Sequence, residues 1–156
     1  MSRRIIICDL DDTLVDPSQR AGLTPPPALR NDTSAWVPYN KACLDDAPIW
    51  STITVMRALQ AAGFLVYIVT SRCKDALAET QEQLKNVCLA PDRLIMREMG
   101  DCRSSADFKR AVLTVIGPEN VLCAYDDQCS VIEMMRELGI TAYQVARHLA
   151  PGIHQC

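Results

Sequence analysis

The chain has 156 residues, of which 49% are hydrophobic and 22% charged, and this composition predicts one ordered globular domain, residues 1–156. Its formal net charge of −3 gives no support to a strongly basic nucleic-acid binder, and leaves room only for a local basic patch. No apolar run is long enough to span a bilayer, and Asp9 interrupts the first run too early for a signal peptide, so we expect a cytoplasmic protein without a membrane partner.

The first predicted element is a strand over residues 4–8 that ends in closely spaced carboxylates. Ile5 to Ile7 form a continuous β-branched run, which is typical of a strand buried on both faces of a parallel sheet. Asp9 and Asp11 follow two residues apart, and Thr13 lies two residues further on. The C-terminal ends of such strands face the crevice where open α/β sheets bind ligands. Because crowded carboxylates repel one another unless a cation holds them, this stretch predicts a hard-metal site beside a possible carboxylate nucleophile.

Residues 14–47 follow the first strand and show no clear helical or strand period. The segment is rich in proline and polar residues, and also holds Trp36 and Tyr39. We interpret it as a long ordered excursion beside the site, of the kind that serves as a lid or a substrate wall, and not as a domain. The preferred interpretation of the two aromatic residues is packing onto the domain, with stacking on a nucleobase as the alternative.

Helical periods alternate with short apolar runs from residue 48 onward. The predicted strands are 64–69, 93–96, 120–124 and 140–145. The predicted helices are 48–62, 73–87, 105–116 and 128–138. This alternation favours parallel strands joined by right-handed crossovers. We therefore predict a doubly wound, Rossmann-like α/β sandwich of three layers, with a mainly parallel five-stranded sheet and no full cap domain.

The eight cysteines contain no Cys-x-x-Cys pair, which argues against a zinc site built from paired ligand spacings. Several of them lie inside apolar runs, where cysteine behaves as a small buried hydrophobe. Reduced core thiols in a cytosolic protein are preferred over a disulfide framework.

Three further polar signals lie at or near the ends of later predicted elements. Thr70 ends the second strand, Lys109 lies early on a helix, and Asp126 and Asp127 end the fourth strand. Thr70 has the alternative of capping the helix that starts near residue 73, and Asp127 that of capping the helix over 128–138. If the fold is correct, the two aspartates can join those that follow the first strand.

Together these signals resemble the four motifs of the haloacid dehalogenase superfamily of phosphatases. Asp9, Asp11 and Thr13 fit its opening motif, and Thr70, Lys109 and the pair Asp126–Asp127 fit the second, third and fourth motifs in order. A narrower likeness is to the 3′-phosphatase domain of phage polynucleotide kinase. It is carried by Met99-Gly100-Asp101-Cys102-Arg103, by residues 107–109, by Asp126 and Asp127, and by residues 131–140 and 143–146. In that family the kinase is a separate P-loop domain. No P-loop motif occurs in this chain, so the resemblance implies only the phosphatase half, with a separate kinase as a possible partner.

The resemblance implies a Mg²⁺-dependent phosphatase for 3′-phosphorylated nucleic acid ends or nucleotides. Asp9 would attack phosphorus and form an aspartyl-phosphate, and Asp11 would act as general acid and then general base. Nearby anions are expected to raise the proton affinity of Asp11 toward working pH. The remaining implied roles are phosphoryl binding by Thr70 and Lys109, substrate binding by Arg72, Arg103 and Thr13, and metal binding by Asp9, the Asp11 carbonyl, Asp126 and Asp127.

Three alternatives stay open at this point. The substrate could be a free 5′-nucleotide or another small phosphomonoester, or the phosphoryl group could pass to an acceptor other than water. A binding module that keeps the fold without catalysis is a third possibility, although it would be expected to have lost Asp9 or Asp11, and both are present.

Overall fold

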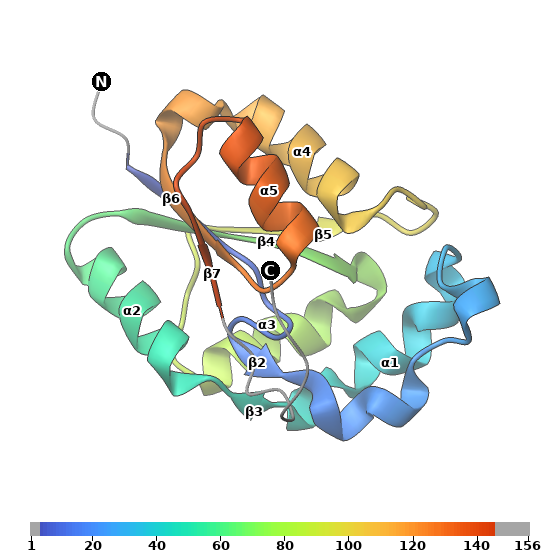
Figure 1. The fold of residues 1–156 in the computed structure, drawn as a ribbon. Coiled ribbons are helices and arrows are strands. Elements are labelled where there is room, and N and C mark those ends of the chain that lie inside the picture. Colours follow the sequence, from blue (N-terminus) through green and yellow to red (C-terminus); the bar gives the residue numbers. More distant parts are fainter. Residues whose placement is uncertain (1–3, 146–156) are drawn as a thin grey trace, which may run out of the picture.

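A five-stranded sheet in the order β5-β4-β1-β6-β7 forms the centre of the protein (Figure 1). The computed structural model describes residues 4–145, and all four pairs of neighbouring strands in this sheet are parallel. The strands are β1 (Ile5–Cys8), β4 (Leu65–Cys73), β5 (Arg93–Arg97), β6 (Val121–Asp126) and β7 (Ala142–Gln144). The predicted fold class and the parallel five-stranded sheet are therefore confirmed.

Helices cover both faces of the sheet and make a three-layer sandwich. They are α2 (Trp50–Ala61) and α3 (Leu77–Asn86) on one face, and α4 (Ser105–Ile116) and α5 (Cys129–Glu137) on the other. Side chains of β1 alternate between the two resulting cores. Ile6 and Cys8 pack with α2 and α3, whereas Ile7 packs with α4 and α5. This two-sided burial is the reason that β1 is a continuous apolar run, and it fixes where the residues after β1 emerge.

The excursion over residues 14–47 is closed at its base by a two-stranded antiparallel ribbon. The strands β2 (Val15–Asp16) and β3 (Ala47–Pro48) pair there, so Pro48 lies in a strand, and α2 begins at Trp50 instead of residue 48. Between them lie α1 (Val37–Lys41) and four 3-10 helices, η1 (Pro17–Leu23), η2 (Pro27–Leu29), η3 (Thr33–Trp36) and η4 (Ala42–Asp45). Short helices of this kind have no long apolar period, which explains why the sequence shows none.

Some element boundaries, and the state of one cysteine, differ from the predictions. β4 continues past Thr70 to Cys73 through an irregularity in its pairing with β5, and the short η5 (Lys74–Ala76) precedes α3. Another 3-10 helix, η6 (Pro118–Asn120), joins α4 to β6. Six cysteines are free thiols, whereas Cys129 is disulfide-bonded, so the expectation of reduced thiols is wrong for Cys129. Within residues 4–145, every helix is too short or too polar to cross a bilayer.

Candidate active site

Asp9 lies directly after β1, at the C-terminal edge of the sheet. Its main-chain N–H donates to the Tyr125 carbonyl of β6 at 2.9 Å, which ties the end of β1 to the neighbouring strand. The chain then turns sharply, because Asp12 adopts a left-handed conformation with φ of 62°. The Leu14 N–H closes this turn onto the Leu10 carbonyl at 2.8 Å. Asp9 and Asp11 both line the cavity that results, and the Thr13 hydroxyl lies 3.5 Å from Asp9 Oδ2.

Lys109 joins two of the aspartates that the sequence placed on separate strands. Its Nζ donates to Asp9 Oδ1 at 2.7 Å and to Asp126 Oδ2 at 2.6 Å, and all three side chains are buried. Ser104 caps the N-terminus of α4 by accepting the Asp107 N–H, and Lys109 lies in the second turn of this helix. Burial alone would lower the pKa of Lys109, but Asp9 and Asp126 outweigh it and raise that pKa. Lys109 is therefore a permanent positive charge between two carboxylates.

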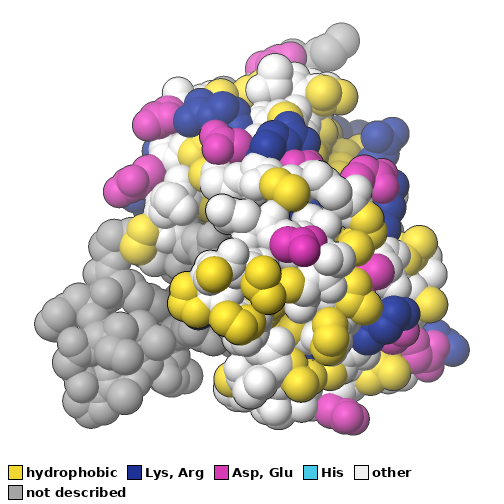
Figure 2. All heavy atoms as spheres, turned by 90° about the vertical axis from the view of Figure 1, so that its right-hand side faces the viewer, with side chains coloured by type: hydrophobic (Ala, Val, Ile, Leu, Met, Phe, Trp, Pro, Cys, Tyr) yellow, Lys and Arg dark blue, Asp and Glu magenta, His cyan; other side chains and the backbone are white. Residues whose placement is uncertain are grey.

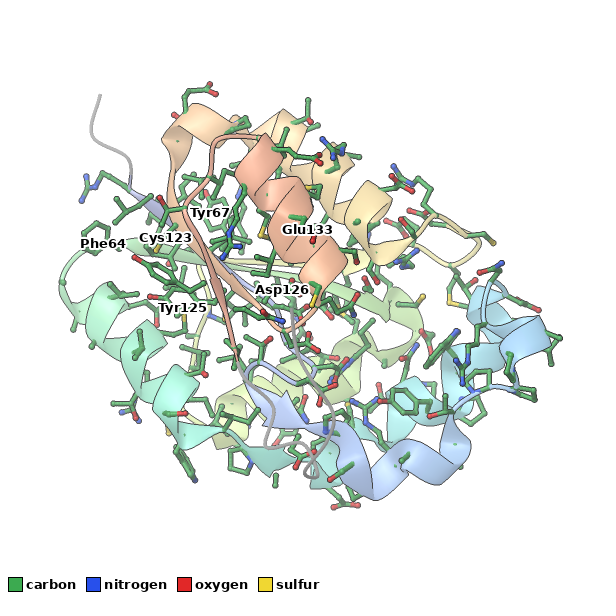
Figure 3. The ribbon with its side chains drawn as sticks, in the orientation of Figure 1. Phe64, Tyr67, Cys123, Tyr125, Asp126 and Glu133 are labelled. Carbon is green, nitrogen blue, oxygen red and sulfur yellow. The ribbon has the colours of Figure 1, made fainter. Side chains whose placement is uncertain are left out.

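Asp9, Asp126 and Asp127 bring three carboxylate oxygens within 4.8 Å of one another. Figure 3 shows Asp126 at the end of β6, near the first turn of α5, and its Oδ1 accepts the Gln128 N–H at 3.0 Å. Burial raises the pKa of Asp9 well above its usual range, against the opposing effect of Lys109. Burial and the adjacent Asp126 raise the pKa of Asp127 to about 7. Burial is the larger cause of both shifts, and the neighbouring carboxylates add to it.

The residues of this acidic cluster fit a magnesium ion. Mg²⁺ prefers oxygen ligands and commonly uses one or two carboxylates together with a substrate phosphate. Within residues 4–145, no group donates a hydrogen bond to the buried Oδ1 atom of Asp127, which is costly unless a ligand occupies that position. The N-cap of α5 is Gln128, so the alternative role of Asp127 as a helix cap is not realised. A contribution from the main-chain carbonyl of Asp11 stays a prediction.

The carboxylate of Asp11 lies among arginines, in contrast to Asp9. Arg72 Nη2 donates to Asp11 Oδ1 at 2.6 Å, and Arg20 Nη2 also donates to this oxygen. Burial would raise the pKa of Asp11, but Arg72 and then Arg20 outweigh it and lower that pKa. The expectation that neighbouring anions raise the proton affinity of Asp11 is therefore wrong, because the excursion and β4 surround it with cations.

A second aspartate, Asp46, is buried and lies beside the same two arginines. Its Oδ1 accepts Arg20 Nε at 2.9 Å and its Oδ2 accepts Arg20 Nη2 at 2.8 Å, while Arg72 Nη2 lies 3.7 Å away. Two arginines and two aspartates thus form a network without net charge, which is the arrangement that makes buried ions tolerable. Asp11 is the member with access to the cavity, since its side chain is 25% exposed and the other three are at 0%. Sequence reasoning missed Arg20 and Asp46, because isolated polar residues in an aperiodic segment carry no signal.

The other predicted site residues lie around the same cavity, which has a volume of about 370 Å³. Thr70 lines it, and its hydroxyl oxygen accepts the Arg72 N–H at 3.1 Å, so the hydroxyl hydrogen can point elsewhere. Arg72 is held away from solvent by Asp11 and by Thr80 and Gln83. Arg103 lines the outer part of the cavity and forms a two-point ion pair with Asp101. Thr13 is buried beside Asp9.

Two segments form opposite walls of the cavity and touch each other. One wall comes from the excursion, with Arg30 and Trp36 among its residues, and the other from the segment between β5 and α4. The N–H of Gly100 donates to the Thr33 hydroxyl at 2.7 Å, which joins the walls. Trp36 packs edge-on against Tyr39 with ring centroids 5.3 Å apart, and both rings also border the cavity. Part of the cavity lining therefore comes from the excursion over residues 14–47.

Comparison with known families identifies the chain. Residues 3–148 match the model of the polynucleotide kinase PNKP phosphatase domain, which is nearly the whole sequence. The chain belongs to this family. It is therefore a phosphatase domain of the haloacid dehalogenase superfamily, as the order of its four motifs predicted. A search of curated proteins finds no match.

Solved structures share the fold at low sequence identity. A chain of the Pnkp1/Rnl/Hen1 complex is 23% identical, with a TM-score of 0.74 over 92% of this chain and 46% of that one. A predicted phosphatase from Clostridium acetobutylicum is 14% identical, with a TM-score of 0.67 and coverages of 91% and 84%. The L-2-haloacid dehalogenase from Xanthobacter autotrophicus is 15% identical, with a TM-score of 0.64 and coverages of 96% and 80%. The chain spans less than half of the length of the matched Pnkp1-complex chain.

Proposed function

We propose that the protein is a Mg²⁺-dependent phosphatase that hydrolyses 3′-phosphomonoesters of polynucleotide ends or nucleotides. The observation that carries the proposal is the position of Asp9. Its carboxylate lies at the end of β1, at a cavity, bonded to Lys109 and within an acidic cluster. Membership of the PNKP phosphatase family supports this type of substrate.

In the first step, an Asp9 carboxylate oxygen attacks phosphorus and the bond from phosphorus to the 3′-oxygen breaks. Thr70 and Lys109 hold the transferring phosphoryl oxygens as donors. Asp11 gives its proton to the leaving 3′-oxygen, which departs as a hydroxyl group. In the second step, Asp11 takes a proton from water, and this water displaces Asp9 from phosphorus to release inorganic phosphate.

The arginines around Asp11 constrain how that residue works. Arg20 and Arg72 favour its charged form, so Asp11 is an anion before substrate binds. A bound phosphate dianion in the cavity would oppose their effect and raise the proton affinity of Asp11. We propose that substrate binding itself prepares the general acid, because Asp11 then takes up from solvent the proton that it later gives to the leaving oxygen. Arg72 influences the reaction through its ion pair with Asp11. Direct binding of Arg72 to the substrate stays a prediction.

Asp9, Asp126 and Asp127 are the residues that would hold Mg²⁺, with the Asp11 carbonyl as an expected fourth ligand. When bound, the ion neutralises repulsion between the nucleophile and the anionic phosphate.

The biological setting that fits this activity is nucleic acid repair. Two of the solved structures similar in fold are of the Pnkp1/Rnl/Hen1 complex, one of which is described as an RNA repair complex. We propose that the protein acts on damaged ends together with a kinase carried by another polypeptide or by another part of a longer chain. A phosphatase for small phosphomonoesters is the second candidate, because a cavity of about 370 Å³ is near the lower end of the range for ligand sites.

A substrate panel tests the proposal directly. With Mg²⁺ present, a 3′-phosphorylated oligonucleotide is expected to release phosphate at least about tenfold faster than its 5′-phosphorylated isomer, since discrimination between isomers by positioned polar groups is of this order. Phosphate release measured for both isomers and for 3′- and 5′-mononucleotides gives the answer. Equal or inverted rates would defeat the 3′ assignment and leave the general phosphatase assignment standing.

Removal of divalent ions tests the acidic cluster. EDTA is expected to stop turnover and excess Mg²⁺ to restore it, because Asp9 otherwise has to attack an anion from within three crowded carboxylates. Addition of Mg²⁺ alone is also expected to raise the melting temperature, which reports binding without substrate. Undiminished turnover in excess EDTA would contradict the metal proposal.

A further inference from the structure

We propose that Arg30 binds a second phosphate of the substrate, the one on the 5′ side of the terminal nucleoside. The protein would then distinguish a polynucleotide end from a small phosphomonoester by this contact. The inference rests on the proposed 3′-phosphatase function and makes it more specific.

Most of the positive charges around the cavity are bound by groups of the protein itself. Arg72 is paired with Asp11, Lys109 with Asp9 and Asp126, and Arg103 with Asp101. Arg97 also lines the cavity, but its guanidinium donates to the main-chain carbonyls of Ser71, Asp101 and Arg103. Arg72, Lys109 and Arg103 are therefore neutralised by carboxylates, and Arg97 is buried, with its Nε and Nη1 bonded to main-chain carbonyls.

Arg30 is different. Its Nε donates to the Pro25 carbonyl at 3.2 Å, and no acceptor or carboxylate of residues 4–145 binds its two terminal nitrogens. Among the described residues that line the cavity, Arg30 is thus the exposed cation that no carboxylate of residues 4–145 neutralises. A guanidinium with both terminal nitrogens available matches the geometry of a phosphate.

The main chain around Arg30 is anchored, which distinguishes it from an arginine on a loose loop. The Arg30 carbonyl accepts Trp36 Nε1 at 2.9 Å, and Asp32 caps η3 by accepting the Ser34 N–H at 2.9 Å. Thr33, three residues on, holds Gly100 of the opposite wall at 2.7 Å. These bonds hold the base of the Arg30 side chain at the cavity, so binding costs mainly the ordering of that side chain.

The chemistry of the substrate supplies the second anion. The 3′-phosphate belongs at Asp9, and a cavity of about 370 Å³ has room for about one nucleotide. We therefore expect the next phosphate along the strand to lie beyond the nucleoside, where the exposed Arg30 is the lining cation available to it. Trp36 lies on the same wall and offers an aromatic surface beside the nucleoside. On the face shown in Figure 2, Lys and Arg side chains are mixed with Asp and Glu and form no continuous basic surface. One local contact to the strand fits this surface better than a long electrostatic track.

The test compares a nucleoside 3′-monophosphate with the corresponding nucleoside 3′,5′-bisphosphate, which differ by one phosphate. For the wild-type protein with Mg²⁺, kcat/KM for removal of the 3′-phosphate is expected to be about ten- to hundredfold higher for the bisphosphate. Arg30→Gln should lower kcat/KM for the bisphosphate by about ten- to hundredfold and so abolish the preference, with a much smaller change for the 3′-monophosphate, which lacks the phosphate that Arg30 binds. Arg57→Gln, which removes an exposed arginine of α2 outside the cavity lining, is the matched control.

The outcomes separate this proposal from the one on which it rests. Hydrolysis of both substrates at equal kcat/KM by the wild-type protein would overturn the role of Arg30 and retain the 3′-phosphatase. An equal loss on both substrates in Arg30→Gln would also overturn it, since that pattern marks a structural effect. Hydrolysis of neither 3′-phosphate, with turnover of a 5′-nucleotide, would overturn both proposals.

Discussion

Asp9→Asn is expected to lower kcat by at least about 10⁴-fold, because it removes the nucleophile on which both chemical steps depend. Asparagine keeps the shape of the side chain and can still accept a hydrogen bond from Lys109 Nζ, which lies 2.7 Å from Asp9 Oδ1. The fold should therefore persist. Burial already penalises the charge of Asp9, so neutralising it removes an electrostatic cost that offsets part of the lost ion pair.

Two measurements check this expectation together. Phosphate release gives the loss of turnover, and the circular dichroism melting curve shows that the variant is folded. Asp45→Asn is the matched control, since it makes the same chemical change at an exposed position that does not line the cavity. Retained turnover in a folded Asp9→Asn protein would remove Asp9 from the nucleophilic role.

The fold could be predicted because its determinants are local. The apolar run of β1 and the helical periods of α2 to α5 each reflect burial against the sheet, and these patterns are visible in a short window. The excursion could be located but not described. Its 3-10 helices are stabilised by caps such as Asp32 and by contacts to distant residues, for example that of Thr33 with Gly100, and no periodic pattern reports such contacts.

The candidate site, like the fold, could be predicted only in part from the sequence. Asp9, Asp126 and Asp127 could be brought together from the sequence, because parallel strands deliver their C-terminal residues to one edge. Lys109 lies on a helix, and only its position in the third motif placed it with them. The charge state of Asp11 could not be predicted, since it depends on Arg20 and Arg72. Arg20 reaches the site only because Asp46 and the ribbon of β2 and β3 bring the excursion back to the sheet.

Lys109→Met is the second change with a large expected effect, since it removes the charge that bridges two buried carboxylates. The Lys109 side chain is 1% exposed, and its Nζ lies 2.7 Å from Asp9 Oδ1 and 2.6 Å from Asp126 Oδ2. Methionine fills a similar volume but leaves those carboxylates and Asp127 without their cation. We expect kcat to fall by about 10²- to 10³-fold, because one donor to the transferring phosphoryl group is lost. The free energy of unfolding without metal should fall by about 3–5 kcal/mol, as for a buried ion pair that loses one partner.

The dependence of this variant on Mg²⁺ shows whether Lys109 and the metal share one acidic cluster. If the cluster of Asp9, Asp126 and Asp127 binds the ion, Mg²⁺ supplies part of the missing positive charge. It should then raise the melting temperature of Lys109→Met more than that of the wild-type protein. Lys85→Met on α3, where the lysine side chain is 78% exposed, controls for the loss of one positive charge. An equal rise in both proteins would mean that the ion binds away from the carboxylates that Lys109 neutralises, and the proposed magnesium site would have to be placed elsewhere.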